Sequence, residues 1–582
     1  MSSPQLVRNA RLMASTAAKH FTDDPIVLLA LASQRLPSSW MSKIGPVARL
    51  LPRQLLLRSL LSLVAGDQKE LQAQLTAAQN KPDTRSAHKV RLANIALAAG
   101  LPDAASSLLS GASPTKASVA PSIARLRWYN GDMQGAVEAL KDISGRRALH
   151  MRNRLESERQ VFHGWQPSLS SVEGYKPTAE TVLHVLTNSL PHTGSGYAQR
   201  SHSVLKAQRQ SGWNVHAVTR PGYPVQLGMF AARSSDVIDD VVYHRILPAT
   251  LPEGMAARLQ YQAEQTLQLA LTVRPSVLHT TTHFVNAVVT AAVAEALGIP
   301  WVYEVRGQLA DTWASPRGAE ARTSERYLAF VARESEATLR ADQCATLGSE
   351  MKSAIIVRES DGPEIELLPN GVGEAFLDAP MKAMAARQRL GLPVEGVFVG
   401  TVSSLVDYEG LDDLIGAFAE LAKSNDALMC LIVGGGAAEA SLRQQAKESG
   451  FTHRIIFTGR VDRKLAHLYH QALDIFVVPR KDSHVTRSVT PLKPVEALAS
   501  SRPVVFSALP ALQETIRDGV EGIAVEPSNR SELAGALGSL AEDARLRHRM
   551  GAAGRERILA ERTWTAVAFQ TTVMYERLKV SQ

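Results

Sequence analysis

Residues 479–499 read PRKDSHVTRSVTPLKPVEALA, and the interpretation of the whole chain starts from this stretch. It follows an apolar run at 474–478 that predicts a buried strand, and it ends in Glu496-Ala-Leu-Ala, which predicts the start of a helix. The loop between them carries cations and hydroxyl groups: Arg480, Lys481, Arg487, Lys493, Ser483, Thr486, Ser488 and Thr490. Such a loop at a helix start predicts an anion site, because free N–H groups and the positive helix end face the ligand.

Three side chains of this stretch indicate the chemical class of the bound anion. Arg480 and Lys493 add full positive charges, and the Glu496 carboxylate can accept hydrogen bonds from sugar hydroxyls. Phosphate and sugar recognised together indicate a nucleotide-sugar. The alternative interpretation is an ordinary buried strand–helix turn with charges at its rim.

The segment TPLKPVEALA, followed by Ser501-Arg-Pro-Val-Val505, resembles the donor-site segment of the retaining glycosyltransferases of family 4. That family has the GT-B fold of two Rossmann domains and usually carries a Glu, seven residues, then a second Glu. Glu496 matches the second Glu, which implies contact with the ribose hydroxyls, whereas the first falls on Ser488. The resemblance also places Thr490, Pro491 and Leu492 in the donor site.

Length and composition limit the class of protein. A chain of 582 residues with 45% hydrophobic content predicts three or four domains of a soluble protein. Its two cysteines, Cys344 and Cys430, stand far apart, which fits a reducing compartment and gives no disulfide or zinc motif. We find no signal peptide and no run that could span a bilayer. We therefore expect a cytoplasmic protein, or one held at the inner face of the membrane.

The basic excess of the chain lies at its N-terminal end. Residues 1–165 hold 22 Lys or Arg and 11 Asp or Glu, whereas the remainder holds 42 and 45. An anionic partner is one interpretation: an acidic membrane surface, an anionic glycan or an acidic protein. Solvated helix faces are the other. Nucleic acid is not expected, because no recognition motif accompanies the charge.

The same region is predicted to be an all-helical, tetratricopeptide-like repeat domain at 1–165. Three similar segments each place an apolar helix, a turn and a second helix around Gly66, Gly100 and Gly131. The glycines are 34 and 31 residues apart, and tetratricopeptide hairpins repeat at about 34 residues. Residues 50–66 also fit a basic amphipathic helix at a membrane surface, although their place in the repeat favours packing. We expect this region to fold as an independent module.

Beyond a polar linker predicted at 166–180, short apolar runs alternate with helical stretches. This alternation predicts α/β architecture with two tandem doubly wound, Rossmann-like sheets. The predicted units are an acceptor-side domain at 181–378, a nucleotide-sugar donor domain at 379–563, and a C-terminal helix at 564–582. The family resemblance covers 181–582 and implies that this last helix crosses back to the first Rossmann domain. Asn370-Gly-Val also resembles the family's passage between domains.

Candidate residues in the acceptor-side domain follow its strands. Gly194 and Gly196 allow a tight turn near the donor phosphates, although no NAD fingerprint is present. The segment 276–287 resembles the family's histidine segment, with His279 at its first position, Thr281 at the second, and His283 nearby. His283 is either a hydrogen-bond donor to sugar or a core histidine. Arg306 is predicted to meet a phosphate or an acidic acceptor, or else to form an ion pair across its loop.

In the donor domain, segment 400–418 resembles the family's first strand and loop. Ser404 stands where members carry Arg, and Glu409 where they carry Lys, so two cations that usually grip the diphosphate are missing. We expect Arg480 and Lys493 to replace them. Gly434 and Gly435 end the next strand and permit close approach of a base or ribose.

These residues favour one interpretation over the others. We expect a hexosyltransferase-type glycosyltransferase that moves a sugar from a nucleotide-diphospho-sugar to a hydroxyl of a glycan, lipid-linked or polysaccharide acceptor. Retention of configuration is implied by the resemblance alone. No Asp-x-Asp triplet occurs, so we expect no metal and no cofactor beyond the donor. Two alternatives stay open: an epimerase or phosphorylase-like enzyme on the same fold, or a catalytically weak carbohydrate-binding scaffold.

Overall fold

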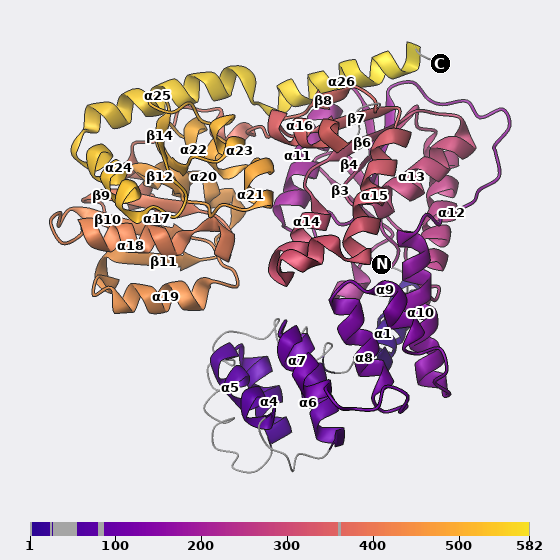
Figure 1. The fold of residues 1–582 in the computed structure, drawn as a ribbon. Coiled ribbons are helices and arrows are strands. Elements are labelled where there is room, and N and C mark those ends of the chain that lie inside the picture. Colours follow the sequence, from indigo (N-terminus) through magenta and orange to yellow (C-terminus); the bar gives the residue numbers. More distant parts are fainter. Residues whose placement is uncertain (1–2, 24–25, 27–54, 80–85, 359–361, 581–582) are drawn as a thin grey trace.

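The computed structural model describes residues 3–23, 26, 55–79, 86–358 and 362–580. Two Rossmann-like domains lie side by side, with an all-helical N-terminal region below them and two long C-terminal helices along the top (Figure 1). This arrangement confirms the predicted fold class. No helix in these described ranges combines the length and apolar character needed to cross a membrane.

The N-terminal region is helical, as predicted. Its described helices are α1 (Ser3–Asp23), α4 (Leu55–Ala65), α5 (Gln68–Gln79), α6 (Ser86–Ala98), α7 (Pro102–Leu109), α8 (Ala120–Tyr129), α9 (Met133–Glu138) and α10 (Arg146–Phe162). Three hairpins, α4–α5, α6–α7 and α8–α9, turn at Gly66, Gly100 and Gly131, whose φ angles are 72°, 76° and 88°. Glycine adopts this left-handed conformation without the steric cost of a Cβ, which explains its recurrence at each turn.

Helix α4 packs within the hairpin stack. Its leucines Leu55, Leu56, Leu60 and Leu63 contact a core shared with α5, α6 and α7. The packed-helix interpretation therefore describes 55–65, while residues 50–54 of the same stretch lie outside the described residues.

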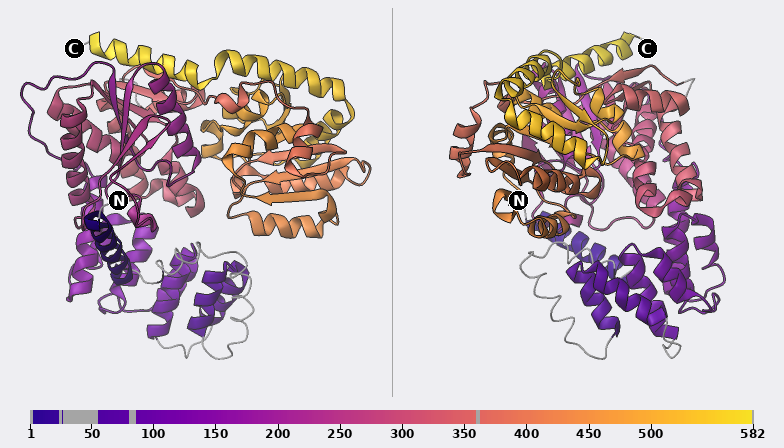
Figure 2. Two further views of the ribbon diagram at one scale, coloured as in Figure 1. Left: turned by 180° about the vertical axis from the view of Figure 1, so that it is seen from behind. Right: turned by 60° about the vertical axis from the view of Figure 1, so that its left-hand side comes forward.

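Part of the helical region packs into the first Rossmann domain, whereas the hairpins α4–α5 and α6–α7 keep a core of their own. Independent folding of residues 1–165 stays a prediction. Leu12 of α1 is 0% exposed and packs against Val225 and Leu247, and the Asn9 amide donates to the carbonyls of Phe230 and Ala232 at 2.9 and 2.8 Å. Val161 and Phe162 of α10, with Met133 of α9, belong to the main core of that domain. Figure 2 shows α1, in indigo, at this junction.

The segment predicted as a linker lies along the surface of the same domain. Leu169, Val172 and Tyr175 pack against its core. The Val172 N–H donates to the Ala296 carbonyl at 2.7 Å, and the Tyr175 hydroxyl donates to the Pro275 carbonyl at 2.8 Å. These contacts hold an irregular segment against the domain.

The first Rossmann domain has a sheet of order β3-β4-β2-β1-β5-β6-β7-β8. Its strands are β1 (Thr181–Leu186), β2 (Asn214–Thr219), β3 (Ser235–Ile238), β4 (Val241–Arg245), β5 (Val277–Thr281), β6 (Trp301–Val305), β7 (Gln343–Thr346) and β8 (Ile365–Leu367). Its main helices are α11 (Gly196–Gln210), α12 (Met255–Val273), α13 (Phe284–Leu297), α14 (Leu309–Ala314), α15 (Glu325–Arg340) and α16 (Ser349–Arg358). All ladders are parallel except β3–β4. The sequence pattern does not predict β3, because this edge strand is partly exposed and lacks an apolar run.

The second Rossmann domain has a fully parallel sheet of order β11-β10-β9-β12-β13-β14. Its strands are β9 (Val397–Val402), β10 (Leu428–Val433), β11 (Ile455–Gly459), β12 (Ile475–Val478), β13 (Val504–Ser507) and β14 (Gly522–Val525). Its helices are α17 (Ala383–Leu390), α18 (Leu411–Leu421), α19 (Glu439–Glu448), α20 (Arg463–Ala472), α21 (His484–Ser488), α22 (Lys493–Ala499), α23 (Pro510–Gln513), α24 (Arg530–Glu542) and α25 (Ala544–Glu561). The strand order reverses between β9 and β12. Open α/β sheets bind ligands at such a reversal, outside the carboxyl ends of the strands.

Two crossings connect the domains. Helix α26 (Trp564–Val580) leaves the second domain and packs on α11 of the first, with Trp564, Met574 and Tyr575 in its core. The passage out of the first domain lies beside the passage back, because Val372 pairs with Thr563. Figure 1 shows α25 and α26, in yellow, running along both domains.

Candidate active site

The stretch 479–499 lies at the reversal point of the second sheet. Pro479 follows β12, and the loop that follows β9 approaches it so closely that a Cβ on Gly410 would lie 1.8 Å from the Pro479 carbonyl oxygen. Gly410 has a φ of 69°, a left-handed conformation that favours glycine. The position therefore requires glycine both for its backbone angle and because a Cβ would clash with Pro479. The loops after β9 and β12 are therefore in direct contact at the carboxyl edge of the sheet.

Glu496 lies buried in the first turn of α22. Its Oε2 lies 2.8 Å from Lys493 Nζ and 3.3 Å from Nε2 of the buried His470. Burial alone would raise the pKa of Glu496, but Lys493 and His470 outweigh it and lower that pKa to about 2. Both contacts use Oε2, so Oε1 of an ionised carboxylate can accept hydrogen bonds from ligand hydroxyls.

Arg480 is paired with the residue that replaces the family's lysine. Its Nη2 lies 2.7 Å from Oε1 of Glu409, its Nε donates to Oε2 at 3.3 Å, and its Nη1 donates to the Val489 carbonyl at 3.1 Å. Both side chains are largely buried. Glu409 therefore neutralises the cation that the sequence predicted for the diphosphate, and the role of Arg480 there stays a prediction.

The other cations of the loop are paired as well. Lys481 contacts Asp412 at 2.8 Å, and Arg487 contacts Asp482 at 2.6 Å on the surface. Lys493, 36% exposed, lies in the first turn of α22 and is paired with Glu496.

Ser404, Gly434 and Gly435 lie at the carboxyl ends of β9 and β10. Ser404 is exposed. Gly434 has a φ of 135°, and a Cβ there would lie 1.9 Å from the Ser403 carbonyl oxygen. On Gly435, the added Cβ would lie 3.0 Å from Cγ of Arg460. The close packing of two loops therefore requires glycine at position 434, while Gly435 lies near the Arg460 side chain. Contact of all three with a donor stays a prediction.

Thr490, Pro491 and Leu492 lie where the two domains meet. The Thr490 hydroxyl donates to Glu514 at 2.7 Å, and the Asn370 amide donates to the Thr490 carbonyl at 3.0 Å. Pro491 is buried, and Leu492 packs against a core of the first domain. Residues 490–492 are therefore held by residues of both domains.

Gly194 and Gly196 lie at the reversal point of the first sheet, between β1 and β5. Both are exposed, and Ser195 between them caps α11 by accepting from the Ala198 N–H at 3.3 Å. An added Cβ would meet only Gln199 at 3.7 Å from Gly194 and nothing within 4 Å at Gly196. The fold itself leaves both positions open, so their predicted role in close ligand approach stays a prediction.

Arg306 belongs to a buried ion cluster around Glu304. Glu304 lies 2.5 Å from Arg306, 2.6 Å from Arg200 and 3.6 Å from His279. Arg306 is 7% exposed and also donates to the Ser201 hydroxyl at 2.7 Å. Of the two interpretations of Arg306, the geometry matches the ion pair. Arg200 further donates to the carbonyls of Leu368 and Pro369, which ties this cluster to the passage between domains.

His283 caps the N-terminus of α13. Its Nδ1 accepts from the Val285 N–H at 3.3 Å, and its ring packs on Phe284 and Phe330. Burial, with the nearby Arg326, lowers the pKa of His283 to about 3. These contacts match a core histidine. His279 is likewise buried, contacting the Tyr575 hydroxyl and stacking on His184.

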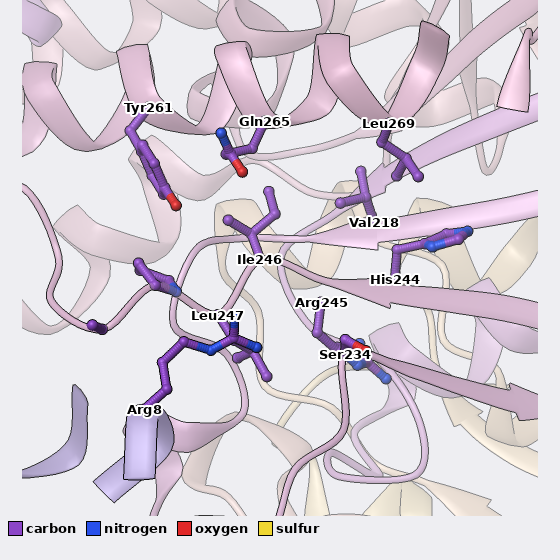
Figure 3. A pocket seen from close by; sticks show the side chains of 12 residues that line it. Arg8, Val218, Ser234, His244, Arg245, Ile246, Leu247, Tyr261, Gln265 and Leu269 are labelled. Atoms are coloured by element: carbon purple, nitrogen blue, oxygen red, sulfur yellow. The ribbon is translucent and has the colours of Figure 1, made fainter. Parts of the chain in front are cut away.

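A cavity opens in the first Rossmann domain, at the carboxyl end of β4 (Figure 3). It measures about 520 Å³ and lies between β4, helix α12 and helix α1. Tyr261 and Gln265 reach into it from α12, His244 from β4, and Arg8 from the N-terminal helix. Burial and the neighbouring His216 lower the pKa of His244 to about 4. The N-terminal region thus contributes a wall of this cavity.

Sequence reasoning missed His470 and Glu514. His470 lies in the amphipathic helix α20 and stacks on Phe476 of β12, so the sequence around it is that of an ordinary core residue. Glu514 accepts from Thr490 of its own domain and from Ser349 and the Glu350 N–H of the other. The contacts of His470 and Glu514 join residues that are distant in the sequence, so no local pattern predicts them.

Two families match the chain. Residues 195–371 match the family described as "Glycosyl transferase 4-like domain", and residues 384–557 match "Glycosyl transferases group 1". The two matches coincide with the two Rossmann-like domains.

Among relatives, a GDP-mannose-dependent alpha-(1-6)-phosphatidylinositol monomannoside mannosyltransferase of Mycobacterium tuberculosis is 30% identical over 207 residues. That match covers 35% of this chain and 54% of the relative, so the chain spans about half the length of this enzyme. A glycogen synthase of the same species is 29% identical over 52% of this chain and 69% of its own.

Solved structures share the fold of the two Rossmann domains. A sucrose-phosphate synthase from Thermosynechococcus elongatus has a TM-score of 0.57 at 21% identity, covering 69% of this chain and 100% of its own. Anabaena HepE in complex with UDP has a TM-score of 0.53 at 16% identity, covering 68% and 100%.

Proposed function

The chain belongs to the family 4 glycosyltransferases of GT-B fold, and on that premise we propose that it transfers a hexose from a nucleotide-diphospho-sugar to an acceptor hydroxyl. The observation that carries the proposal is the ionised, buried Glu496 beside Lys493 at the reversal point of the second sheet. The donor's ribose would bind Glu496, and its diphosphate would face Lys493.

The binding partners of related proteins support this donor class. HepE was solved with UDP and with UDP-glucose, and the mycobacterial mannosyltransferase is named for GDP-mannose. These names place uridine and guanosine donors first among those to test.

We propose that departure of the diphosphate is assisted by cations and backbone N–H groups. Negative charge builds on the leaving group as the glycosidic bond breaks, and a fixed cation stabilises that charge most in the transition state. Lys493, which lies beside Glu496, would take this role, while Arg480 would act as part of its pair with Glu409. The absence of an Asp-x-Asp triplet from the sequence supports a metal-independent reaction.

Retention of anomeric configuration is part of the proposal and rests on the family resemblance. The acceptor hydroxyl would enter from the first Rossmann domain, whose reversal point carries the exposed Gly194 and Gly196. The acceptor would be a glycan, a lipid-linked sugar or a polysaccharide end.

The test is a panel of nucleotide-sugars incubated with the full chain. UDP-glucose, UDP-galactose, GDP-mannose and ADP-glucose would be tested for binding by calorimetry and for nucleotide release by chromatography. We expect one donor to bind and release its nucleoside diphosphate, and Glu496→Gln to weaken that binding at least tenfold. Glu542→Gln, on an exposed helix end of the same domain, is the matched control. Binding that is equal in wild type and Glu496→Gln would remove Glu496 from the site.

A further inference from the structure

A pocket of about 360 Å³ lies at the junction between the helical hairpins and the acceptor-side domain. One wall comes from α6, α8 and α10, and the other from α14, the short helix Ser315–Arg317 and the start of α15. Its volume falls within the range of small-molecule sites, roughly 300–1,000 Å³. The pocket exists only because the two regions pack together.

Aromatic rings and guanidinium groups alternate along this pocket. Trp128 and Tyr129 come from α8 and Trp313 from α14, and all three are half-buried. The Arg317 guanidinium lies 4.6 Å from the ring centroid of Tyr129 and 4.7 Å from that of Trp313. Arg326 lies 5.7 Å from both Trp128 and Trp313. These contacts hold rings and cations in a fixed array.

Four arginines line the pocket, and each of them also contacts another group of the protein. These are Arg125, Arg154, Arg317 and Arg326, and no Asp or Glu occurs among the described residues that line the pocket. Arg326 contacts Glu158 at 3.1 Å, outside that lining. Burial and the charge of Arg326 lower the pKa of Arg317, as expected for neighbouring cations. The surrounding region 1–165 carries twice as many basic as acidic residues.

We propose that this junction pocket binds an acidic saccharide, as a part of the acceptor remote from the reacting hydroxyl. Aromatic rings stack on the apolar faces of sugar rings, and a guanidinium fork matches a carboxylate in two parallel hydrogen bonds. A uronic-acid residue offers both features at once. An aromatic array without charge would suit neutral glycans, and arginines without rings would suit any anion.

The position of the pocket connects it with the candidate active site. Helix α14 follows β6 at the carboxyl edge of the first sheet, and Trp313 near its end lines the pocket. The same helix contacts α21, which lies within the stretch 479–499. One short helix therefore separates the junction pocket from the donor loop, which fits an acceptor chain that extends from one to the other. The ligand class rests on the proposed function.

The test measures binding of defined oligosaccharides to the full chain by calorimetry at low salt. We expect a galacturonic-acid hexamer to bind, with affinity that falls as salt rises, and maltohexaose to bind at least tenfold more weakly. Polyglutamate of equal charge should also bind at least tenfold more weakly, because it lacks sugar rings. Equal binding of polyglutamate, or no binding of the acidic hexamer, would overturn the proposal.

Matched variants locate the binding site. Arg125→Gln and Arg154→Gln should each weaken hexamer binding about tenfold, while Arg154→Lys keeps the charge and should retain part of it. Arg127→Gln removes a cation from α8 outside the pocket, where Arg127 is 46% exposed, and should leave binding unchanged. Thermal unfolding checks that the variants are folded. Equal effects of Arg127→Gln and Arg125→Gln would mean that the region attracts anions only through its net charge.

Donor turnover in the same preparations separates the two proposals. Nucleotide release without hexamer binding would contradict the proposal for the junction pocket and support the proposed function. Hexamer binding without nucleotide release from any donor would contradict the proposed function and support saccharide binding at the junction pocket.

Discussion

At the scale of single residues, Glu496 combines burial with a low pKa. Its carboxylate, 8% exposed, stays ionised because Lys493 and His470 offset the cost of burial. An ionised, largely buried carboxylate suits recognition of sugar hydroxyls, and it also stabilises the fold.

The stability of the fold should therefore depend on the ionisation of Glu496. Its folded-state pKa of about 2 lies below the ordinary value of 4.5, so ionised Glu496 stabilises the fold above about pH 4.5. This stabilisation, on the order of 3 kcal/mol, is lost as the pH falls from 4.5 towards 2. Urea denaturation at several pH values should show wild type losing free energy of unfolding faster than Glu496→Gln. Parallel curves would contradict the assignment.

The pair of Arg480 and Glu409 gives a second prediction at this scale. Arg480→Gln leaves the Glu409 carboxylate facing the diphosphate site alone, so kcat should fall on the order of 10²-fold. The double variant Arg480→Gln with Glu409→Gln removes that repulsion and should recover part of the loss. Steady-state nucleotide release measures both. Lys447→Gln, on α19, serves as the control, and equal losses in single and double variants would place the diphosphate elsewhere.

At the scale of elements, α26 is part of the core of the first Rossmann domain. Gln208 Nε2 donates to the Tyr575 hydroxyl at 3.1 Å, that hydroxyl also contacts His279, and Trp213 packs edge-on against the Tyr575 ring at 4.9 Å. The helix thus completes the face of the sheet that α11 covers.

Tyr575→Phe keeps the packing and removes the hydroxyl. Gln208 and His279 then lose a buried partner, so the free energy of unfolding should fall by about 1–3 kcal/mol. Urea denaturation measures the change. Phe569→Ala alters a residue of the same helix that is 68% exposed, and should cost far less. A larger loss from Phe569→Ala would show that α26 packs differently.

At the scale of the whole molecule, Glu514 connects the two Rossmann domains. It accepts from Ser349 and the Glu350 N–H at the start of α16 and from Thr490 in the donor loop. Gly348 makes this approach possible, because a Cβ there would lie 1.8 Å from Oε1 of Glu514. Glu514 is therefore one of the residues that fix the second domain against the first.

Glu514→Ala should loosen this connection. Thr490 and the N-terminus of α16 lose their acceptor, so we expect small-angle scattering to give a larger radius of gyration and donor binding to weaken severalfold. Glu542→Ala is the exposed control. An unchanged radius with unchanged donor affinity would show that the crossings at 369–372 and 563–564 hold the domains together without Glu514.

The sequence by itself determined the two series of strands, the helical hairpins and the position of the donor loop. Strands buried on both faces are short apolar runs, and these hairpin turns use glycine. Local sequence patterns therefore predict both features. Glu496 and Lys493 could be found for the same reason, since a single strand–loop–helix unit carries them.

Only the tertiary structure decided which charges meet. Glu409 and Arg480, His470 and Glu496, and Glu514 and Ser349 lie far apart along the chain and are joined by the reversal of the strand order and by the contact of two domains. The docking of α1 and the junction pocket were equally hidden, because each depends on surfaces that form only after separate elements pack. Local patterns fix elements, whereas ion pairs and pockets follow from how distant elements come together.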